Sequence, residues 1–218
     1  MSLRGSRPVD PHRGQPVVSR GVELRAARAA MLMVHGRGAT ADSILTLADL
    51  LDAPGFAFLA PQAAGNTWYP NRFLEPLASN EPWLSSALTR LEETLGTIAA
   101  AGVPADRTIL LGFSQGACLA LEFVARHARR YAGAAGLSGG LIGPDNTPRD
   151  YPGSLDRTPV FLGCSDIDPH IPAPRVAHTA EVLTRLGAAV TAKIYKGMGH
   201  TINDDELDAV RQMMHEVA

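Results

Sequence analysis

Residues 108–124 read Thr-Ile-Leu-Leu-Gly-Phe-Ser-Gln-Gly-Ala-Cys-Leu-Ala-Leu-Glu-Phe-Val, and this stretch decides the fold. Residues 108–111 form a short apolar run typical of a buried strand, and residues 117–124 predict a buried helix. Between them lies a Gly-x-Ser-x-Gly turn at residues 112–116. Such a turn strains the serine backbone and lifts the hydroxyl above the end of the sheet. The stretch therefore predicts that Ser114 is a nucleophile.

Both glycines of this turn indicate close packing. A Cβ atom at Gly112 or Gly116 would strike the neighbouring strand or helix, so both positions need glycine. The five-residue pattern also occurs by chance. A nucleophile therefore requires further support from a base, an acid and an oxyanion hole elsewhere in the chain.

Composition and charge narrow the class of protein. The chain has 218 residues, of which 45% are hydrophobic, and it can bury a substantial core without disulfides or metals. The formal net charge of −2 gives no electrostatic reason to expect binding to nucleic acid. Cys118 and Cys164 lie in apolar surroundings without metal-ligand spacing, so we expect two free thiols. We expect neither a metal nor a cofactor.

The chain shows no sign of a targeting or membrane-spanning segment. No window reaches the ~18 apolar residues of a membrane span, and the N-terminal region lacks the apolar core of a signal peptide. Two free thiols suit a reducing compartment, so we expect a cytoplasmic protein. Residues 1–15 predict a flexible N-terminal tail, and residues 16–218 predict a single domain.

Strand-like and helix-like segments alternate along the chain. Strands are expected within residues 16–25 and at residues 29–34, 56–59, 108–113, 132–137, 159–163 and 189–195. Helices are expected at residues 40–51, from about residue 80 to 102, after Ser114, at 172–186 and after residue 203. Asn80 is an expected helix cap, and Asn203 is expected to form a capping box with Glu206. The alternation predicts an α/β fold with a mainly parallel twisted sheet and helices on both faces.

Residues that acyl transfer requires follow three of the predicted strands. Ser114 follows one strand, Asp166 and Asp168 follow another, and His200 follows the last. The carboxyl ends of parallel strands share one edge of the sheet, so we expect these side chains to meet. His200 would take the proton of Ser114, and an aspartate would orient the imidazole. From the spacing alone either aspartate can be that acid, the other stabilising the turn.

An oxyanion hole is predicted from two backbone N–H groups. One belongs to Gln115, directly after the serine, and the other belongs to the loop at residues 35–38, where Arg37 is the expected donor. The Arg37 side chain either lies in solvent or holds an acidic substrate. His35 is expected to tie down this loop, and His12 is expected to be solvated.

Five short motifs occur in a definite order. They are His35-Gly36-x-Gly38, Gly112-Phe113-Ser114-Gln115-Gly116-Ala117, Leu137-Ser138-Gly139, Asp168-Pro169-x-Ile171-Pro172 and Gly197-Met198-Gly199-His200. Together they resemble the phospholipase/carboxylesterase family of α/β-hydrolases, which includes the acyl-protein thioesterases. The resemblance begins at about residue 29 and extends to the C-terminus. It implies an α/β-hydrolase fold, and the short insertions in the chain predict a minimal lid or none.

The resemblance also implies roles for individual residues. It makes Ser114, Asp168 and His200 the catalytic triad, and it favours Asp168 as the acid. It places Arg37 and Gln115 at the oxyanion hole. The family more often has an apolar or small residue where Arg37 stands.

The activity expected from these motifs is hydrolysis of carboxylic esters or thioesters through an acyl-enzyme. The expected partner is a small-molecule ester or thioester. Trp68, Tyr69 and Phe73, in one loop over the active edge, are candidate substrate-binding residues, with ordinary loop packing as the alternative. The resemblance allows a homodimer. Two alternative functions are a dienelactone-hydrolase-like lactone hydrolase, which is expected to carry cysteine instead of Ser114, and a non-catalytic ligand-binding module.

Overall fold

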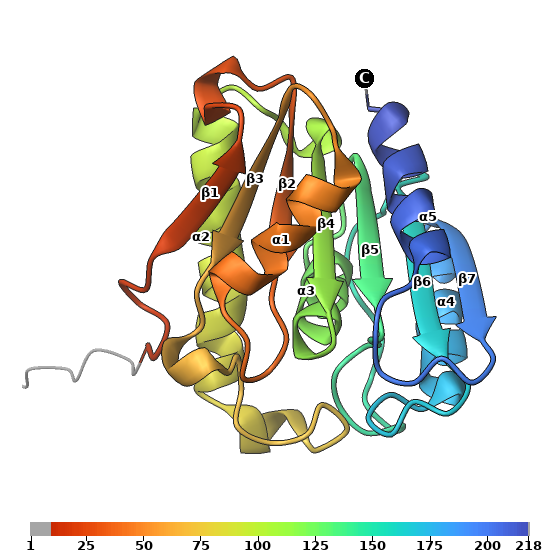
Figure 1. Ribbon diagram of the computed structural model, residues 1–218. Helices are drawn as coiled ribbons and strands as arrows, with labels where there is room; N and C mark the ends of the chain where they lie inside the picture. The colour runs from red at the N-terminus through yellow and green to blue at the C-terminus, as the bar shows by residue number, and fades with distance from the viewer. Residues whose placement is uncertain (1–9, 218) are drawn as a thin grey trace, which may run out of the picture.

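A seven-stranded sheet forms the centre of the molecule, and helices cover both of its faces (Figure 1). The computed structural model describes residues 10–217. The strands are β1 (Val17–Gly21), β2 (Ala29–Val34), β3 (Phe56–Pro61), β4 (Thr108–Phe113), β5 (Gly133–Leu137), β6 (Pro159–Ser165) and β7 (Ala189–Tyr195). Their order across the sheet is β1-β3-β2-β4-β5-β6-β7, and only the edge strand β1 pairs antiparallel among these seven. The sequence prediction of a mainly parallel sheet is confirmed.

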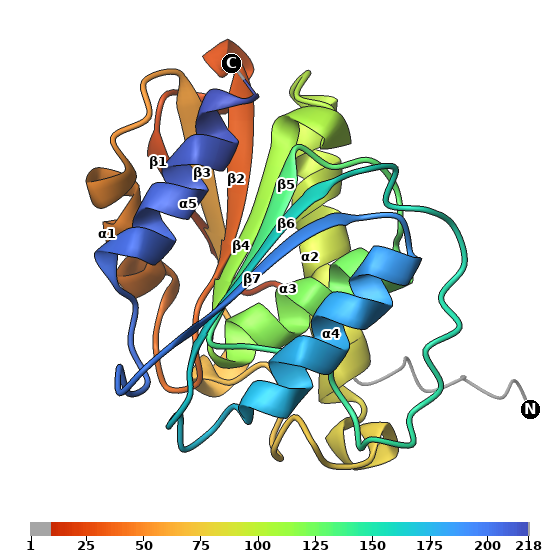
Figure 2. The same ribbon diagram turned by 90° about the vertical axis from the view of Figure 1, so that its right-hand side faces the viewer.

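Figure 2 shows the helices in two layers, one on each side of the sheet. They are α1 (Ala41–Leu51), α2 (Trp83–Ala100), α3 (Gln115–Arg126), α4 (Ala173–Arg185) and α5 (Asp204–His215). Helices α1 and α5 cover one face, while α2, α3 and α4 cover the other. Short 3-10 helices lie at Leu24–Ala26, Ala64–Asn66, Leu77–Asn80 and Ala105–Arg107. Among the described residues, no helix combines the length and the apolar character needed to span a membrane.

The two faces of the sheet have separate hydrophobic cores because side chains alternate along each strand. Met31 and Met33 on β2 belong to one core, and Leu32 and Val34 belong to the other. Every residue of β2 is buried, as expected for a central parallel strand covered on both sides. By contrast, the edge strand β7 is mostly exposed.

The helix starts agree only partly with the sequence prediction. Asn203 and Glu206 form the predicted capping box at the start of α5. Asn80, however, does not cap α2, which begins at Trp83. The carboxylate of Glu81 accepts the Ser85 N–H at 3.1 Å in the first turn instead. Asn80 is buried, because its side chain forms hydrogen bonds with the backbone of Asn71 and Arg72.

The N-terminal segment differs from the predicted flexible tail where the structure describes it. Residues 1–9 of that prediction lie outside the described residues. His12 is fully buried, and its ring lies 5.4 Å from the rings of both Trp68 and Trp83. Its backbone N–H donates to Ser86 on α2 at 2.9 Å. His12 is therefore packed against the folded domain, although the sequence predicted a flexible tail there.

The turn between β4 and α3 has the predicted tight geometry. A Cβ atom at Gly116 would lie 2.1 Å from the carbonyl oxygen of Val34, and one at Gly112 would lie 2.3 Å from the Gly116 carbonyl oxygen. Ser114 has φ 56° and ψ −122°, a strained conformation for a residue with a side chain. The need for both glycines, and the strain at the serine, are confirmed.

We predict that Gly116→Ala lowers the free energy of unfolding by about 3 kcal/mol or more, because α3 and β2 must move apart. Gly96→Ala is the matched control, since Gly96 lies exposed within α2 and a Cβ there meets nothing within 4 Å. It should stabilise the protein by about 1 kcal/mol through helix propensity. Urea unfolding of both variants measures the difference, and equal stabilities would contradict the packing argument.

Candidate active site

Three loops at the carboxyl edge of the sheet bring Ser114, Asp168 and His200 together. His200 Nε2 lies 2.8 Å from Ser114 Oγ, and His200 Nδ1 lies 2.7 Å from Asp168 Oδ2. Ser114 follows β4, Asp168 follows β6 and His200 follows β7. The three side chains thus form one hydrogen-bonded chain, in the order serine, histidine, aspartate.

Asp168 is surrounded by donors. Its Oδ1 accepts the N–H groups of His170 at 2.8 Å and Ile171 at 3.0 Å, while Oδ2 faces His200. Desolvation of the buried carboxyl opposes ionisation, but the hydrogen bonds from His200 and from the two N–H groups outweigh it. The pKa of Asp168 therefore lies below its ordinary value. An ionised carboxylate can hold the Nδ1 proton of His200 and leave Nε2 free to accept.

Asp166, the other candidate acid, contacts the loop of His200 and not its ring. Its Oδ1 accepts the N–H of Gly197 at 2.8 Å, and its own N–H donates to the carbonyl of Tyr195 at 3.0 Å. The hydroxyl of Ser165 accepts the N–H of Gly199 at 3.2 Å. Asp166 and Ser165 thus hold the turn that presents His200.

Two further rings contact the imidazole of His200. Phe113, the last residue of β4, lies 5.0 Å from it between ring centroids. His170 approaches it edge-on at 4.8 Å and also lines the cavity. Spacing along the chain does not show this contact between the two rings.

The loop after β2 lies against the serine. A Cβ atom at Gly36 would lie 3.3 Å from Ser114 Cβ, so this loop passes very close to the reacting hydroxyl. The N–H of Arg37 has no hydrogen-bond acceptor among residues 10–217. The N–H of Gln115 is the first of α3 and has no acceptor within the helix. Two N–H groups are thus available beside Ser114.

The side chains of these two donors bind one segment, residues 67–73, which we term the wall segment. Arg37 Nη1 donates to the carbonyl of Pro70 at 2.8 Å, and Nη2 donates to the carbonyl of Asn71 at 2.6 Å. Gln115 Oε1 accepts the N–H of Trp68 at 3.0 Å. The Arg37 side chain therefore anchors a loop, a role that neither sequence interpretation of this cation contained.

The wall segment and the strand-end loops enclose a cavity of about 710 Å³ next to Ser114. Tyr69 and Phe73 line it, together with Phe113, Cys118 and Ile171 among others. Trp68 does not line it, which differs from the sequence prediction.

Trp68 instead packs inside the protein. It is fully buried, and its Nε1 donates to the carbonyl of His35 at 2.8 Å.

The contacts of Asn80 explain why it does not cap α2, although the sequence predicted that it would. Its Oδ1 accepts the N–H of Asn71 at 2.9 Å, and its Nδ2 donates to the carbonyl of Arg72 at 3.3 Å. A side-chain amide satisfies two backbone groups of the wall segment and is therefore unavailable as a helix cap.

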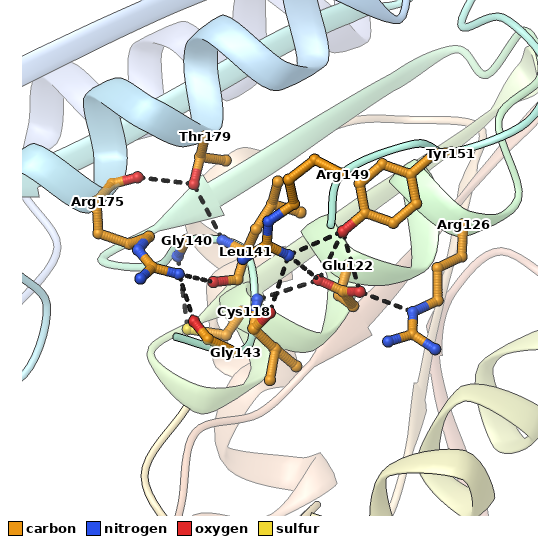
Figure 3. Close-up of polar contacts among 11 residues, drawn as sticks. Cys118, Glu122, Arg126, Gly140, Leu141, Gly143, Arg149, Tyr151, Arg175 and Thr179 are labelled. Atoms are coloured by element: carbon orange, nitrogen blue, oxygen red, sulfur yellow. Dashed lines mark hydrogen bonds and ion pairs between the residues drawn. The ribbon is translucent and has the colours of Figure 1, made fainter. Parts of the chain in front are cut away.

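Figure 3 shows a buried polar cluster, which contacts the wall segment through Gly143. Glu122 on α3 lies 3.4 Å from Arg149 Nη1, and both side chains are almost completely buried. Arg175 on α4 donates to the carbonyl of Gly143 at 2.6 Å. The N–H of Gly143 in turn donates to the carbonyl of Phe73 at 2.7 Å. The cluster thus holds the segment after β5 against the cavity wall.

Both cysteines are buried and unbonded, as predicted. Cys118 lies one turn after Ser114, accepts the Gly140 N–H at 3.5 Å and lines the cavity. Burial raises the pKa of the Cys118 thiol to about 12, so it is protonated at neutral pH. A buried, protonated thiol of this kind is a poor nucleophile.

His12 and His35 hold the residues just before the wall segment, and the sequence analysis did not predict this role for His12. His12 Nδ1 accepts the N–H of Ala64 at 3.1 Å, and His35 Nε2 accepts the N–H of Ala63 at 3.1 Å. The remaining nitrogens face carbonyl oxygens, those of Trp68 and Gly36 respectively. Each ring must accept at one nitrogen, so both are neutral. No local pattern around His12 signals this contact.

Comparisons with known proteins agree with this architecture. The family model for Phospholipase/Carboxylesterase matches residues 17–217. The crystal structure of a phospholipase/carboxylesterase from Dyadobacter fermentans is similar, with a TM-score of 0.89 and 40% identity, over 93% of this chain and 97% of that one. Acyl-protein thioesterase 1 from Gibberella zeae is 34% identical over 53% of this chain and 50% of that protein. Acyl-protein thioesterase 1 from Saccharomyces cerevisiae is 27% identical over 85% of this chain and 91% of that protein.

The chain belongs to the phospholipase/carboxylesterase family, and its fold is the α/β-hydrolase fold, as the five sequence motifs predicted. The alignments with Gibberella zeae and Neurospora crassa acyl-protein thioesterase 1 span only about half of those relatives, 50% and 48% of their lengths.

We predict that stability falls in mild acid through His12 and His35. Desolvation lowers the pKa of both below the ordinary 6.5, so the unfolded chain binds more protons. Their contribution is complete above pH 6.5 and decreases as the pH falls toward their folded pKa values. His12→Gln can keep both hydrogen bonds without titrating. It should reduce the slope of unfolding free energy against pH by up to about 1.4 kcal/mol per unit.

The unmodified protein is the reference for that slope. Urea unfolding at intervals between about pH 7 and about pH 5 measures it. Parallel curves for His12→Gln and the unmodified protein would contradict the neutral ring at His12.

Proposed function

We propose that this protein is a cofactor-free serine hydrolase that cleaves carboxylic esters or thioesters through an acyl-enzyme. The observation that carries the proposal is the hydrogen-bonded chain from Ser114 Oγ through His200 to Asp168, with distances of 2.8 and 2.7 Å. Relatives named acyl-protein thioesterase and phospholipase/carboxylesterase support esters and thioesters as the substrate class.

The geometry is suited to a two-step reaction. His200 Nε2 accepts the proton of Ser114 as Oγ attacks the carbonyl carbon, and Asp168 stabilises the resulting imidazolium. The N–H groups of Arg37 and Gln115 bind the oxyanion of the tetrahedral intermediate. His200 then gives its proton to the leaving group. A water molecule, deprotonated by the same imidazole, releases the acyl group from Ser114.

The cavity favours small or medium substrates. Its volume of about 710 Å³ is within the usual range for small-molecule sites. Aromatic rings of Tyr69, Phe73 and Phe113 supply apolar walls, and the polar side chains of Arg72 and Glu75 lie at its border. A small-molecule ester or thioester is therefore the partner we propose. A homodimer and a cytoplasmic location stay predictions.

Replacing the nucleophile tests the assignment directly. Ser114→Ala should lower kcat for a p-nitrophenyl acyl ester by about 10⁶-fold and abolish labelling by a fluorophosphonate. Ser85→Ala, at an exposed serine on α2, should retain both. Turnover by Ser114→Ala at the rate of the unmodified enzyme would rule out this mechanism.

A matched pair of aspartate variants tests the acid. Asp168→Asn should lower kcat by about 10⁴-fold, because an amide cannot hold the required tautomer of His200. Asp166→Asn removes a charge two residues away, yet it can still accept from the Gly197 N–H, so its kcat should fall less than about tenfold. Steady-state kinetics of both variants measures these changes in kcat. A larger loss in Asp166→Asn than in Asp168→Asn would make Asp166 the acid of the triad.

A further inference from the structure

Thr67 lies between the side chains of Arg37 and Gln115. Its Oγ1 accepts a hydrogen bond from Arg37 Nη1 at 3.2 Å. The same hydroxyl lies 3.3 Å from Gln115 Oε1 and 3.0 Å from the carbonyl oxygen of Tyr69, both of which are acceptors. One half-buried threonine therefore joins the two residues whose N–H groups we assign to the oxyanion hole.

Two backbone hydrogen bonds hold the loop around Arg37: the Gly38 N–H donates to the carbonyl of Asn66 at 2.7 Å, and the Ala39 N–H donates to the carbonyl of Gly36 at 3.2 Å. Arg37 stands between two glycines, and Gly38 has φ 76°, so this loop contains residues with wide conformational freedom. The N–H of Gln115, in contrast, is held by α3. The relative position of the two N–H groups consequently depends on what restrains Arg37.

The side chain of Arg37 adds a further restraint to these backbone hydrogen bonds. It makes three hydrogen bonds to the wall segment, and their acceptors are the hydroxyl of Thr67 and the carbonyl oxygens of Pro70 and Asn71. All three acceptors are neutral, and Arg37 forms no ion pair with any residue in the part of the chain described. A planar guanidinium with several donors suits such a multi-point anchor.

Gln115 completes the connection from the other side. Its Oε1 accepts from Trp68 N–H at 3.0 Å, and its Nε2 donates to the carbonyl of Tyr69 at 2.8 Å. The wall segment is thus held by both proposed oxyanion residues, with Thr67 at the junction. Movement of this segment would move Arg37 relative to Gln115.

We propose that Thr67 and the guanidinium of Arg37 are positioning residues, which act through the wall segment to hold the Arg37 N–H in place for the oxyanion. The inference rests on the proposed function, because it concerns the transition state of that reaction. It gives the Arg37 cation a role that does not require an acidic substrate.

Thr67→Val tests this, since it preserves the shape of the side chain and removes the hydroxyl. We expect kcat for p-nitrophenyl butyrate to fall about fivefold, the equivalent of one hydrogen bond, with KM nearly unchanged. Affinity for an alkyl trifluoromethyl ketone, which forms a tetrahedral oxyanion on the serine, should fall by the same factor. Thr67→Ser restores the hydroxyl and should recover both values.

Arg37→Met removes the whole anchor and should lower kcat by about 30-fold, less than the loss of an oxyanion donor itself. The loss should be the same for a neutral p-nitrophenyl butyrate and for the p-nitrophenyl monoester of glutaric acid, which carries a carboxylate. Arg20→Met is the control, because Arg20 is an exposed arginine paired with Asp49 and should leave kcat unchanged.

An unchanged kcat in Thr67→Val, a loss confined to KM, or a selective loss of the acidic ester in Arg37→Met would overturn the inference. Thermal unfolding of each variant separates lost structure from lost positioning. If Thr67→Val does not fold, the exposed Arg37→Met carries the same test. Activity that persists in Ser114→Ala would instead overturn the proposed function, so the two failures are distinguishable.

Discussion

The contact between α3 and β2 at Gly116 is the constraint on which the rest of the site depends. A Cβ atom there would lie 2.1 Å from the Val34 carbonyl oxygen, so the helix backbone lies directly on the strand. This approach places Ser114 above the sheet edge and the Gln115 N–H beside the loop that contains Arg37. The nucleophile and the proposed oxyanion donor at Gln115 therefore owe their positions first to backbone packing.

Hydrogen bonds from side chains fix the position of the wall segment. The wall segment, together with the residues just before it, is held by hydrogen bonds from side chains distant in sequence, including Arg37, Gln115 and Asn80. His12 and His35 accept N–H groups just before it. Backbone groups in such a segment have no partners from a helix or sheet, so side chains must satisfy them. Because Arg37 and Gln115 both bind this segment, the shape of the cavity is linked to the geometry of the proposed oxyanion hole.

The fold could be predicted because hydrophobic periodicity reports local structure and burial directly. The strands and helices followed from it, and the capping box followed from the types and spacing of Asn203 and Glu206. Asn80 shows where this reasoning fails: an asparagine before a helix is a good cap unless a loop elsewhere needs its amide. The predictions that Trp68 lines the pocket and that His12 is solvated were wrong for a related reason. A residue type suggests an environment, but it does not identify the groups that the side chain contacts.

The sequence alone determined the sheet, the tight turn at Ser114 and the chain order of serine, aspartate and histidine, because each depends on local pattern and on the shared edge of parallel strands. Only the tertiary structure decided that Asp168, and not Asp166, contacts His200, since two residues of loop direct the two carboxylates to different partners. It also decided that the Arg37 side chain anchors the cavity wall. Hydrogen bonds between distant segments depend on distances that exist only after folding.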